Sequence, residues 1–296
     1  MNTCTLGNLL ESIGQIETPI IVHVHELNFW IKHRLGLDNF NRLLNFNPHF
    51  IACSNAVKDN LINICKVPSQ QIEVVHAFVP TDSLIQSRTK TKQQVRQELG
   101  IGKDTFVVVS CGTLDWRKGA DLLIPLVVLL KEKMPTNNFV CLWIGGWQNK
   151  LSESEMKFAI EKAGIENNLL LTGHKQDPIN YLGAGNMFML LSREDPFPLV
   201  MSEAGICKLP VVGFERSGGV TEFVENEAGF TVPYLNLNAM ANQIINLYKN
   251  PDKVQKMGKN AYKKVCNLYS ENILAPKILD RINYVSSEVR EYSSAE

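Results

Sequence analysis

The sequence lacks any long hydrophobic run. Its longest unbroken apolar stretch is Phe139 to Ile144, whereas a membrane-spanning helix needs ~18 or more such residues, so we expect no transmembrane segment. The start, Met1 to Gln15, has neither a basic region nor an apolar core and does not look like a secretory signal. Net charge is also missing, since Lys plus Arg and Asp plus Glu both number 30. This balance removes a global attraction to nucleic acid or anionic lipid and leaves only a local basic site open.

Cysteines are few and widely spaced. Seven are present, and no two lie two to four residues apart, so the spacing of a zinc knuckle is missing. Several sit within or beside apolar runs, as Cys111 and Cys141 do, which favours buried thiols. Because disulfides persist mainly in oxidising compartments, this pattern indicates reduced cysteines in a cytoplasmic protein.

Three common phosphate and metal signatures are absent as well. The chain has no GxxxxGK followed by Ser or Thr, no GxGxxG after a strand and no Asp-x-Asp pair. These absences exclude a P-loop NTPase and a dinucleotide-binding fingerprint, and they leave no recognisable metal motif.

What the sequence contains is an alternation of short apolar runs with amphipathic ones. Between the runs we expect helices, for example one over Asn55 to Cys65 with Ser54 as its N-cap. Near-continuous apolar strands are typical of parallel sheets covered on both faces, so the fold class is α/β with doubly wound, Rossmann-like units. The nine expected strands are Pro19 to Val24, Phe50 to Cys53, Ile72 to Val75, Phe106 to Ser110, Phe139 to Ile144, Leu169 to Thr172, Met187 to Leu191, Pro210 to Phe214 and Gly229 to Val232.

Ligands of doubly wound sheets bind at the carboxyl ends of the strands, so we expect chemistry in the loops that follow them. The loop Cys111 to Gly119 carries Arg117 and Lys118 beside a small-residue turn at a helix start. Two cations there oppose the helix dipole, which favours a bound phosphate or diphosphate over a solvated pair. The loop Gly145-Gly146 either lets a ligand approach the backbone or is a plain turn.

A later loop carries Asp195, with Glu203 eight residues further on. Pro198 is expected to open a helix there, whose free N–H groups at Leu199 and Val200 suit an anion. Asp195 suits sugar hydroxyls and Glu203 suits a ribose. A glycosidase-type carboxylate pair, or plain surface carboxylates, are the alternatives.

Two weaker signals complete the candidates. The Gly-rich segment Ser217 to Glu222 leads into a short helix and is a candidate anion nest. In Val22 to Glu26, alternation puts His23 and His25 on one side of a strand, with His25 at its carboxyl end facing a cleft. The alternative for His25 is a buried histidine of the core.

Taken together, these segments resemble the family-4 retaining glycosyltransferases, which have the GT-B fold. The spacing of Asp195 and Glu203 is similar to the family's acidic-x7-Glu motif, within SREDPFPLVMSEA. The resemblance covers nearly the whole chain, and it also includes the segments VHVHELNFW, HFIACSNAVKDNLI, CGTLDWRKGADLLI and LPVVGFERSGGVTEFVENEAGFTVP.

The resemblance implies two Rossmann-like domains facing a cleft, with a nucleotide-sugar as co-substrate, most simply a UDP- or GDP-sugar, and no other cofactor or metal. The residues it implies for catalysis are His25, Arg117, Lys118 and Asp195. The residues it implies around the donor are Arg117, Lys118, Gly145, Gly146, Gly173, His174, Pro198, Leu199, Val200 and Glu203.

Within that set the resemblance implies separate roles. Arg117 and Lys118 hold the diphosphate, and the backbone N–H groups of Leu199 and Val200 lie near the phosphates. Glu203 binds the ribose and Asp195 the donor sugar, while His25 reaches the transferred sugar from across the cleft. Gly173 and His174 lie near the base.

The chain departs from the family pattern in two residues. Asp195 stands where the family commonly has Glu, and its side chain is shorter by about one methylene, for which the neighbouring Glu194 is a candidate to compensate. Thr113 stands where many relatives carry Arg, so the diphosphate clamp rests on Arg117 and Lys118.

The polar segment QSRTKTKQQ indicates a domain boundary near residue 95. The expected division is a partial, acceptor-side domain over 1–95, a nucleotide-sugar-binding domain over 96–270, and a C-terminal segment over 271–296. In that last segment, residues 272–284 are expected to form a helix that crosses back, followed by a loose tail. The resemblance implies halves of similar size, so we expect the first domain to be incomplete, as in a fragment, a truncated gene product or a reduced variant.

The predicted activity is therefore transfer of a sugar to an acceptor hydroxyl with retention at the anomeric carbon. The acceptor is a saccharide or a lipid-linked molecule, which leaves room for peripheral membrane contact, and the sequence does not specify an oligomeric state. A nucleotide-sugar epimerase or phosphorylase and a non-catalytic nucleotide-sugar-binding remnant are the alternatives.

Overall fold

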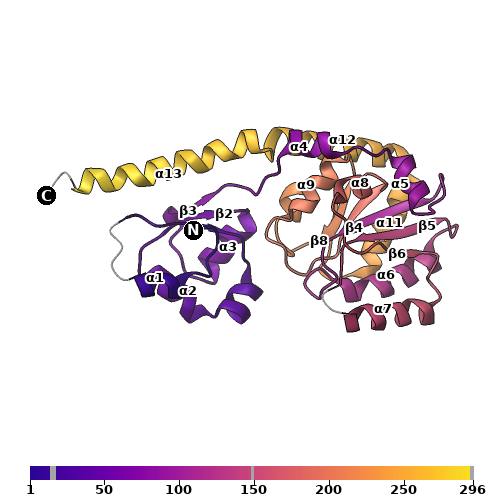
Figure 1. The fold of residues 1–296 in the computed structure, drawn as a ribbon, viewed down its shortest axis with the longest axis horizontal. Helices are drawn as coiled ribbons and strands as arrows, with labels where there is room; N and C mark the ends of the chain where they lie inside the picture. The colour runs from indigo at the N-terminus through magenta and orange to yellow at the C-terminus, as the bar shows by residue number, and fades with distance from the viewer. Residues whose placement is uncertain (14–17, 148–149, 294–296) are drawn as a thin grey trace.

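The computed structural model describes residues 1–13, 18–147 and 150–293, which form two α/β units and one long C-terminal helix (Figure 1). All nine predicted strands are present, each within two residues of its expected limits. This outcome confirms the α/β, Rossmann-like fold class. None of the helices in the described ranges is long and apolar enough to cross a membrane.

The first unit is built on a parallel sheet of three strands in the order β1-β2-β3. These strands are β1 (Ile21–Val24), β2 (His49–Ala52) and β3 (Ile72–Val74). Ser54 caps α3 (Asn55–Asn63) as predicted, because its side chain accepts a hydrogen bond from the Val57 N–H at 3.1 Å. The other helical segments of this unit are α1 (Gly7–Ile13), the π-helix η1 (Trp30–Leu35), α2 (Leu37–Leu44) and the 3₁₀ turn η2 (Ser69–Gln71).

The second unit has a six-stranded, fully parallel sheet in the order β6-β5-β4-β7-β8-β9. The chain builds outward from β4 to β6, returns to the other side of β4 with β7, and continues to β9. The switch point of this doubly wound sheet therefore lies between β4 and β7, where such folds form their ligand crevice. The strands are β4 (Phe106–Cys111), β5 (Phe139–Ile144), β6 (Leu169–Leu171), β7 (Met187–Leu190), β8 (Val211–Phe214) and β9 (Gly229–Val232).

Helices cover both faces of this sheet, as the continuous apolar runs predict. Every residue of β5 is buried. In β4, Val107 and Val109 pack into one hydrophobic cluster while Phe106 and Val108 pack into the other. The covering helices are α6 (Ala120–Lys133), α7 (Lys150–Ala163), α8 (Pro178–Leu182), α9 (Leu199–Ile206), α10 (Val220–Val224), α11 (Leu237–Lys249) and α12 (Pro251–Leu268).

The boundary expected at residue 95 falls inside a helix of the second unit. Both α4 (Thr81–Ser87) and α5 (Lys92–Glu98) pack beside α8. Arg96 is buried and donates to the Ala184 carbonyl at 3.0 Å, while Lys92 donates to the Gly185 carbonyl at 2.7 Å. The polar segment that suggested a linker therefore belongs to helices of the second unit. The charged groups of its Lys92 and Arg96 side chains donate hydrogen bonds to buried carbonyls of that unit.

The chain passes between the units at two places that are bonded to each other. Val79, just before α4, donates its N–H to the Tyr269 carbonyl at 3.2 Å. In return the Val79 carbonyl accepts from the Glu271 N–H at 3.2 Å, which makes a short parallel bridge between Val79 and Ser270. The outgoing and returning crossings therefore run side by side.

The C-terminal helix α13 (Glu271–Ser293) leaves the second unit and runs along the first, in yellow in Figure 1. Arg281 anchors it there, 3.2 Å from His49 Nδ1 and 3.4 Å from a Glu73 carboxylate oxygen. The expectation of a loose tail was wrong for residues 286–293, which continue the helix. No Gly or Pro interrupts the chain after Pro276, and extending an existing helix adds one hydrogen bond per residue. Residues 294–296 of the expected tail lie outside the described residues.

Candidate active site

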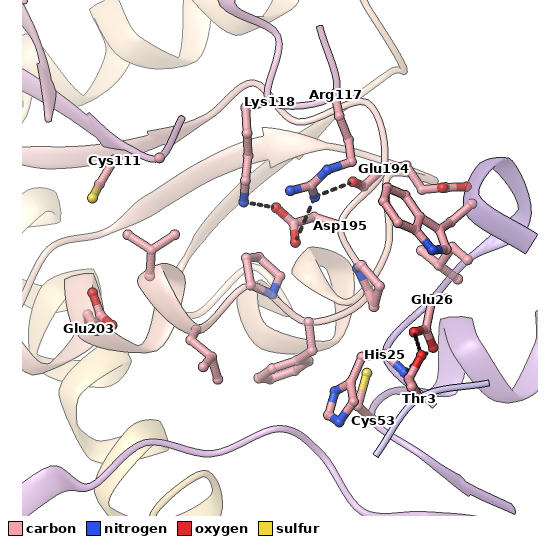
Figure 2. A pocket seen from close by; sticks show the side chains of 18 of the residues that line it. Thr3, His25, Glu26, Cys53, Cys111, Arg117, Lys118, Glu194, Asp195 and Glu203 are labelled. Carbon is pink, nitrogen blue, oxygen red and sulfur yellow. Dashed lines mark hydrogen bonds and ion pairs between the residues drawn. The ribbon is translucent and has the colours of Figure 1, made fainter. Parts of the chain in front are cut away.

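A cleft of about 770 Å³ opens between the two units, at the carboxyl ends of β1, β4 and β7 (Figure 2). This is the switch point of the second sheet, so the strand topology explains where the cleft lies. Of the twelve residues singled out from the sequence, eight line it, namely His25, Arg117, Lys118, Asp195, Pro198, Leu199, Val200 and Glu203.

A charged cluster forms the wall on the side of the second unit. Lys118 Nζ lies 2.6 Å from one Asp195 carboxylate oxygen, and Arg117 Nη1 lies 3.7 Å from the other. The Lys118 and Asp195 side chains are only 15% and 9% exposed. Ser192 Oγ donates a further hydrogen bond to Asp195 at 3.0 Å. Two cations thus meet one carboxylate in a partly dry site, so this cluster of three side chains carries one net positive charge.

The Asp195 backbone is fixed by the Gly-rich turn that the sequence offered as a second anion nest. Asp195 donates its N–H to the Ser217 carbonyl at 2.6 Å, and Gly219 donates to the Asp195 carbonyl at 3.3 Å. At Gly218, with φ +130°, a Cβ would lie 1.8 Å from the Asp195 carbonyl oxygen, so no other residue fits. The turn therefore buttresses Asp195, and the Gly219 N–H of the candidate anion nest is used in that contact.

Helix α9 begins directly at the cleft. Pro198 is its N-cap, with φ −66° and ψ 117°, one residue earlier than the first helical position expected for it. Leu199 and Val200 open the helix and line the cleft. N–H groups of the first helical turn have no partner within the helix, and the helix dipole adds positive potential there. This end of α9 therefore adds to the positive field of Lys118 and Arg117.

Glu203 lies about one turn further along α9 and also lines the cleft. Burial raises the pKa of its carboxyl above the ordinary value. Within the described ranges, no hydrogen bond or ion pair to this carboxylate is present. A half-buried carboxylate without a partner is costly, and it suits a ligand hydroxyl pair that donates to it.

His25 faces the cleft from the first unit, directly after β1. Burial lowers the pKa of its imidazole, an effect that nearby Glu26 only partly offsets, so the ring is neutral at pH 7. Its Nε2 lies 2.9 Å from the Asn2 amide oxygen, and its ring centroid is 4.1 Å from that of His23. A neutral imidazole in this position exchanges hydrogen bonds with a ligand rather than adding charge.

Gly145, Gly146, Gly173 and His174 lie beside the cleft rather than in its wall. They follow β5 and β6, and Gly145 donates to the Gly173 carbonyl at 3.0 Å. A Cβ on Gly145, which has φ +144°, would lie 1.9 Å from the carbonyl oxygen of Gly112, a residue that does line the cleft. These glycines therefore keep the strand ends in close contact next to the site.

Glu194 does not compensate for the shorter side chain of Asp195. Its two carboxylate oxygens accept from the Phe29 N–H of the first unit at 2.9 and 3.2 Å. In Figure 2 its side chain points away from the Lys118–Asp195 pair. The contribution of Glu194 is a link between the units.

A second link between the units was not foreseen from the sequence. Glu222, on α10, accepts hydrogen bonds from the Asn55 and Ala56 N–H groups, both at 3.0 Å, and lies 2.7 Å from His76 Nε2. Burial raises the pKa of this carboxyl, but the bonds from His76, Asn55 and Ala56 outweigh that effect, so its pKa lies below the ordinary value. Glu222 holds the N-terminus of α3 against the second unit.

The first unit also contributes cleft residues that sequence reasoning missed. Glu26 accepts from the His25 N–H at 2.9 Å and from the Thr3 hydroxyl. Trp30, which is 42% exposed, lines the cleft nearby. Position after a strand end was the one available signal for Glu26. Among the described residues, no group of three or more His, Cys, Asp or Glu side chains is arranged to hold a metal ion.

Two Rossmann-like units that face each other across a cleft define a protein of the GT-B class, and the solved structures that this fold resembles are of that class. One is HepE from Anabaena in complex with UDP-glucose, with a TM-score of 0.77 at 20% identity over 99% of this chain and 76% of HepE. This similarity concerns the fold.

The sequence comparison defines the family. Residues 91–264 match the model of the glycosyl transferases group 1, and residues 9–83 match that of glycosyltransferase family 4. The chain belongs to the glycosyl transferases group 1 family.

Two curated relatives come from Staphylococcus aureus. The chain is 29% identical to a poly(ribitol-phosphate) alpha-N-acetylglucosaminyltransferase over 56% of its own length and 33% of that relative's. It is 25% identical to the capsular polysaccharide biosynthesis glycosyltransferase CapM over 76% of its own length and 56% of that relative's. The chain thus spans between a third and just over half of these two proteins.

Proposed function

We propose that this protein transfers a glycosyl group from a nucleotide-diphosphate sugar to an acceptor hydroxyl, with retention at the anomeric carbon and without a metal ion. One observation carries the proposal: Lys118, Arg117 and the N-terminus of α9 line one cleft at the switch point of the second sheet. Fixed positive charge is what a departing diphosphate requires, since stabilising developing charge is the main task in such a reaction. A UDP-sugar is the preferred donor, because the similar HepE structure holds UDP-glucose.

The proposed step breaks the bond between the anomeric carbon and the diphosphate oxygen and forms one to the acceptor oxygen on the same face. The acceptor proton passes to the departing diphosphate, so no protein nucleophile is needed. Lys118 and Arg117 stabilise the negative charge that develops on the diphosphate, and Asp195 and His25 hydrogen-bond the transferred sugar. Closing the cleft excludes water and prevents hydrolysis.

The remaining roles follow from position. Glu203, whose carboxylate meets no partner among the described residues, accepts from the ribose hydroxyls. Gly173 and His174, after β6, border the nucleobase. The acceptor is a saccharide or a lipid-linked molecule. It enters the cleft on the side of the first unit, beside Glu26 and Trp30. Seven unpaired cysteines support a reducing, cytoplasmic compartment.

The function is tested by combining a donor screen with product analysis. UDP-, GDP- and ADP-sugars are compared by thermal shift, since a ligand specific for the folded state raises the Tm. The stabilising donor, labelled in its sugar, is then incubated with simple glycoside acceptors in EDTA. We expect labelled glycoside with unchanged anomeric configuration. Binding with neither transfer nor hydrolysis would instead indicate a non-catalytic protein, and an isomerised donor would indicate an epimerase.

Replacing Glu203 with glutamine should stabilise the unliganded protein while weakening nucleotide binding. At pH 7 the variant removes an unpartnered, half-buried charge, and we expect a gain of about 1 kcal/mol. Since burial raises the folded-state pKa, that gain is complete above this pKa and disappears as the pH falls below about 4.3, the unfolded value. Calorimetry should show nucleotide affinity reduced roughly tenfold, equivalent to one lost hydrogen bond.

Glu227→Gln, at an exposed position of the second unit, is the matched control and should leave both properties unchanged. Wild-type nucleotide affinity in the Glu203→Gln variant would disprove the ribose role, whatever happened to its stability.

A further inference from the structure

A second cavity, of about 490 Å³, lies at the opposite end of the six-stranded sheet from the cleft. Its wall includes Phe106 at the start of β4, Asn186 just before β7 and Leu209 just before β8. All these strands are parallel, so their amino ends meet here while their carboxyl ends meet at the cleft. Nothing in the proposed transfer reaction uses this cavity.

Three basic side chains line this cavity, from three different elements. Arg88 follows α4, Lys92 opens α5 and Lys208 follows α9. Arg88 and Lys208 also line an adjoining hollow of about 360 Å³, so both stand between two open spaces. We refer to Arg88, Lys92 and Lys208 as the cationic triad. The triad cannot be recognised from the sequence, because its members are separated by up to 120 positions.

The charge of the triad is not balanced within the described part of the chain. No carboxylate there lies within ion-pair distance of any of the three, and Asp252 is the one acidic residue of the described chain that lines the cavity. Lys92 Nζ donates to the Gly185 carbonyl, but burial together with Arg96 and Arg88 lowers the pKa of Lys92 to about 8. Arg88 and Lys92 are part-buried and Lys208 is exposed. Clustered cations without counter-charge are unfavourable, most of all where they are part-buried, and a bound anion relieves them.

Lys208 is also held in a conformation that glycine would adopt more easily. Its φ is +59°, the left-handed region that commonly ends a helix at a glycine. A Cβ on Gly258 would lie 2.0 Å from the Lys208 carbonyl oxygen, so α12 fixes this backbone closely. The Lys208 ammonium lies 5.2 Å from the centre of the Tyr262 ring. The backbone of Lys208 is therefore fixed where its side chain lines the cavity.

We propose that the cationic triad binds a phosphate group, at a site separate from the cleft. Phosphate carries enough charge to balance the cluster, and a guanidinium matches its geometry with two parallel hydrogen bonds. The phosphate is either a free anion, inorganic or part of a small metabolite, or the headgroup of an anionic lipid. The site recognises the same chemistry in both cases.

The first test follows the thermal unfolding of the full chain in inorganic phosphate against chloride at equal ionic strength. We expect phosphate to raise the Tm of the wild type and to have little effect on Lys208→Gly or Arg88→Gln. Lys66→Gly is the matched control, because Lys66 is exposed, has φ +60° and lies in the first unit. Both glycine variants remove one charge and relieve the same backbone conformation, but only Lys208→Gly should lose the response, with at least tenfold weaker phosphate binding by calorimetry.

The second test distinguishes the source of the phosphate and its place of binding. Flotation with phosphatidylglycerol vesicles, against phosphatidylcholine vesicles, should recover the wild type and Lys66→Gly but not Lys208→Gly if the ligand is a headgroup. A phosphate response that Lys118→Ala abolishes and Lys208→Gly retains would assign phosphate to the cleft and overturn the proposal. A wild type that responds neither to phosphate nor to phosphatidylglycerol would overturn it as well.

Discussion

The Lys118→Ala variant is expected to transfer sugar roughly 10²- to 10³-fold more slowly than the wild type, the usual loss when one fixed group that stabilises transition-state charge is removed. The Lys118 ammonium lies 2.6 Å from Asp195 in a site where both side chains are largely buried. In such surroundings a charge acts more strongly on a ligand than it does in water. The substitution also leaves the Asp195 carboxylate facing the diphosphate without its strongest partner. Turnover with a UDP-sugar and nucleotide affinity by calorimetry measure the two effects.

Lys157→Ala is the control for this result. Lys157 is 67% exposed on α7 and pairs with Glu153 one turn away, so its loss should leave turnover within about twofold of the wild type. Unchanged nucleotide affinity in the Lys118→Ala variant would contradict the diphosphate role. Turnover restored by Lys118→Arg would show that positive charge is sufficient there.

The Glu222→Ala variant is expected to lose about 2 kcal/mol of stability and to favour an open arrangement of the two units. The substitution removes a carboxylate that accepts from the N-terminus of α3 and from His76, and hydrogen bonds to charged groups are the stronger ones. Small-angle X-ray scattering should show a larger radius of gyration, and the KM for the donor should rise. The matched control is Glu227→Ala, which removes an exposed carboxylate of the same unit.

The Glu222 carboxylate also makes the docking of the two units sensitive to acid. The folded-state pKa of Glu222 is depressed. Its contribution to the free energy of unfolding is therefore complete above the unfolded pKa of about 4.3 and is lost as the pH falls through the folded-state pKa. The wild type should therefore expand in acid toward the dimensions of the variant, while the variant itself changes less. Identical pH profiles for the two proteins would exclude Glu222 as the group responsible.

The sequence predicts those features that depend on local pattern. The run Phe139 to Ile144 is apolar throughout, so it forms a strand buried on both faces, and strands of this kind imply a parallel sheet. Parallel strands carry their following loops to the same edge, which is why Lys118 and Asp195, 77 positions apart, are expected near each other and lie 2.6 Å apart.

The features that could not be predicted depend on distant pairs. Glu222 meets Asn55 and His76, which are 167 and 146 positions away, and its own neighbourhood indicates only a Gly-rich helix start. The cationic triad is likewise assembled from three separate elements. The domain boundary was misplaced because Lys92 and Arg96 look like linker residues by composition, although the carbonyls of Gly185 and Ala184 bind them.

The bridge between Val79 and Ser270 limits how the cleft can open. A single peptide crossing would let the units rotate about several axes. Two crossings that are joined by reciprocal hydrogen bonds restrict the motion to rotation about one hinge axis. We expect the main motion to be a swing about that pair, in which His25 departs from Lys118 along an arc. Substrate would then enter and product leave through one fixed side of the molecule, opposite the hinge.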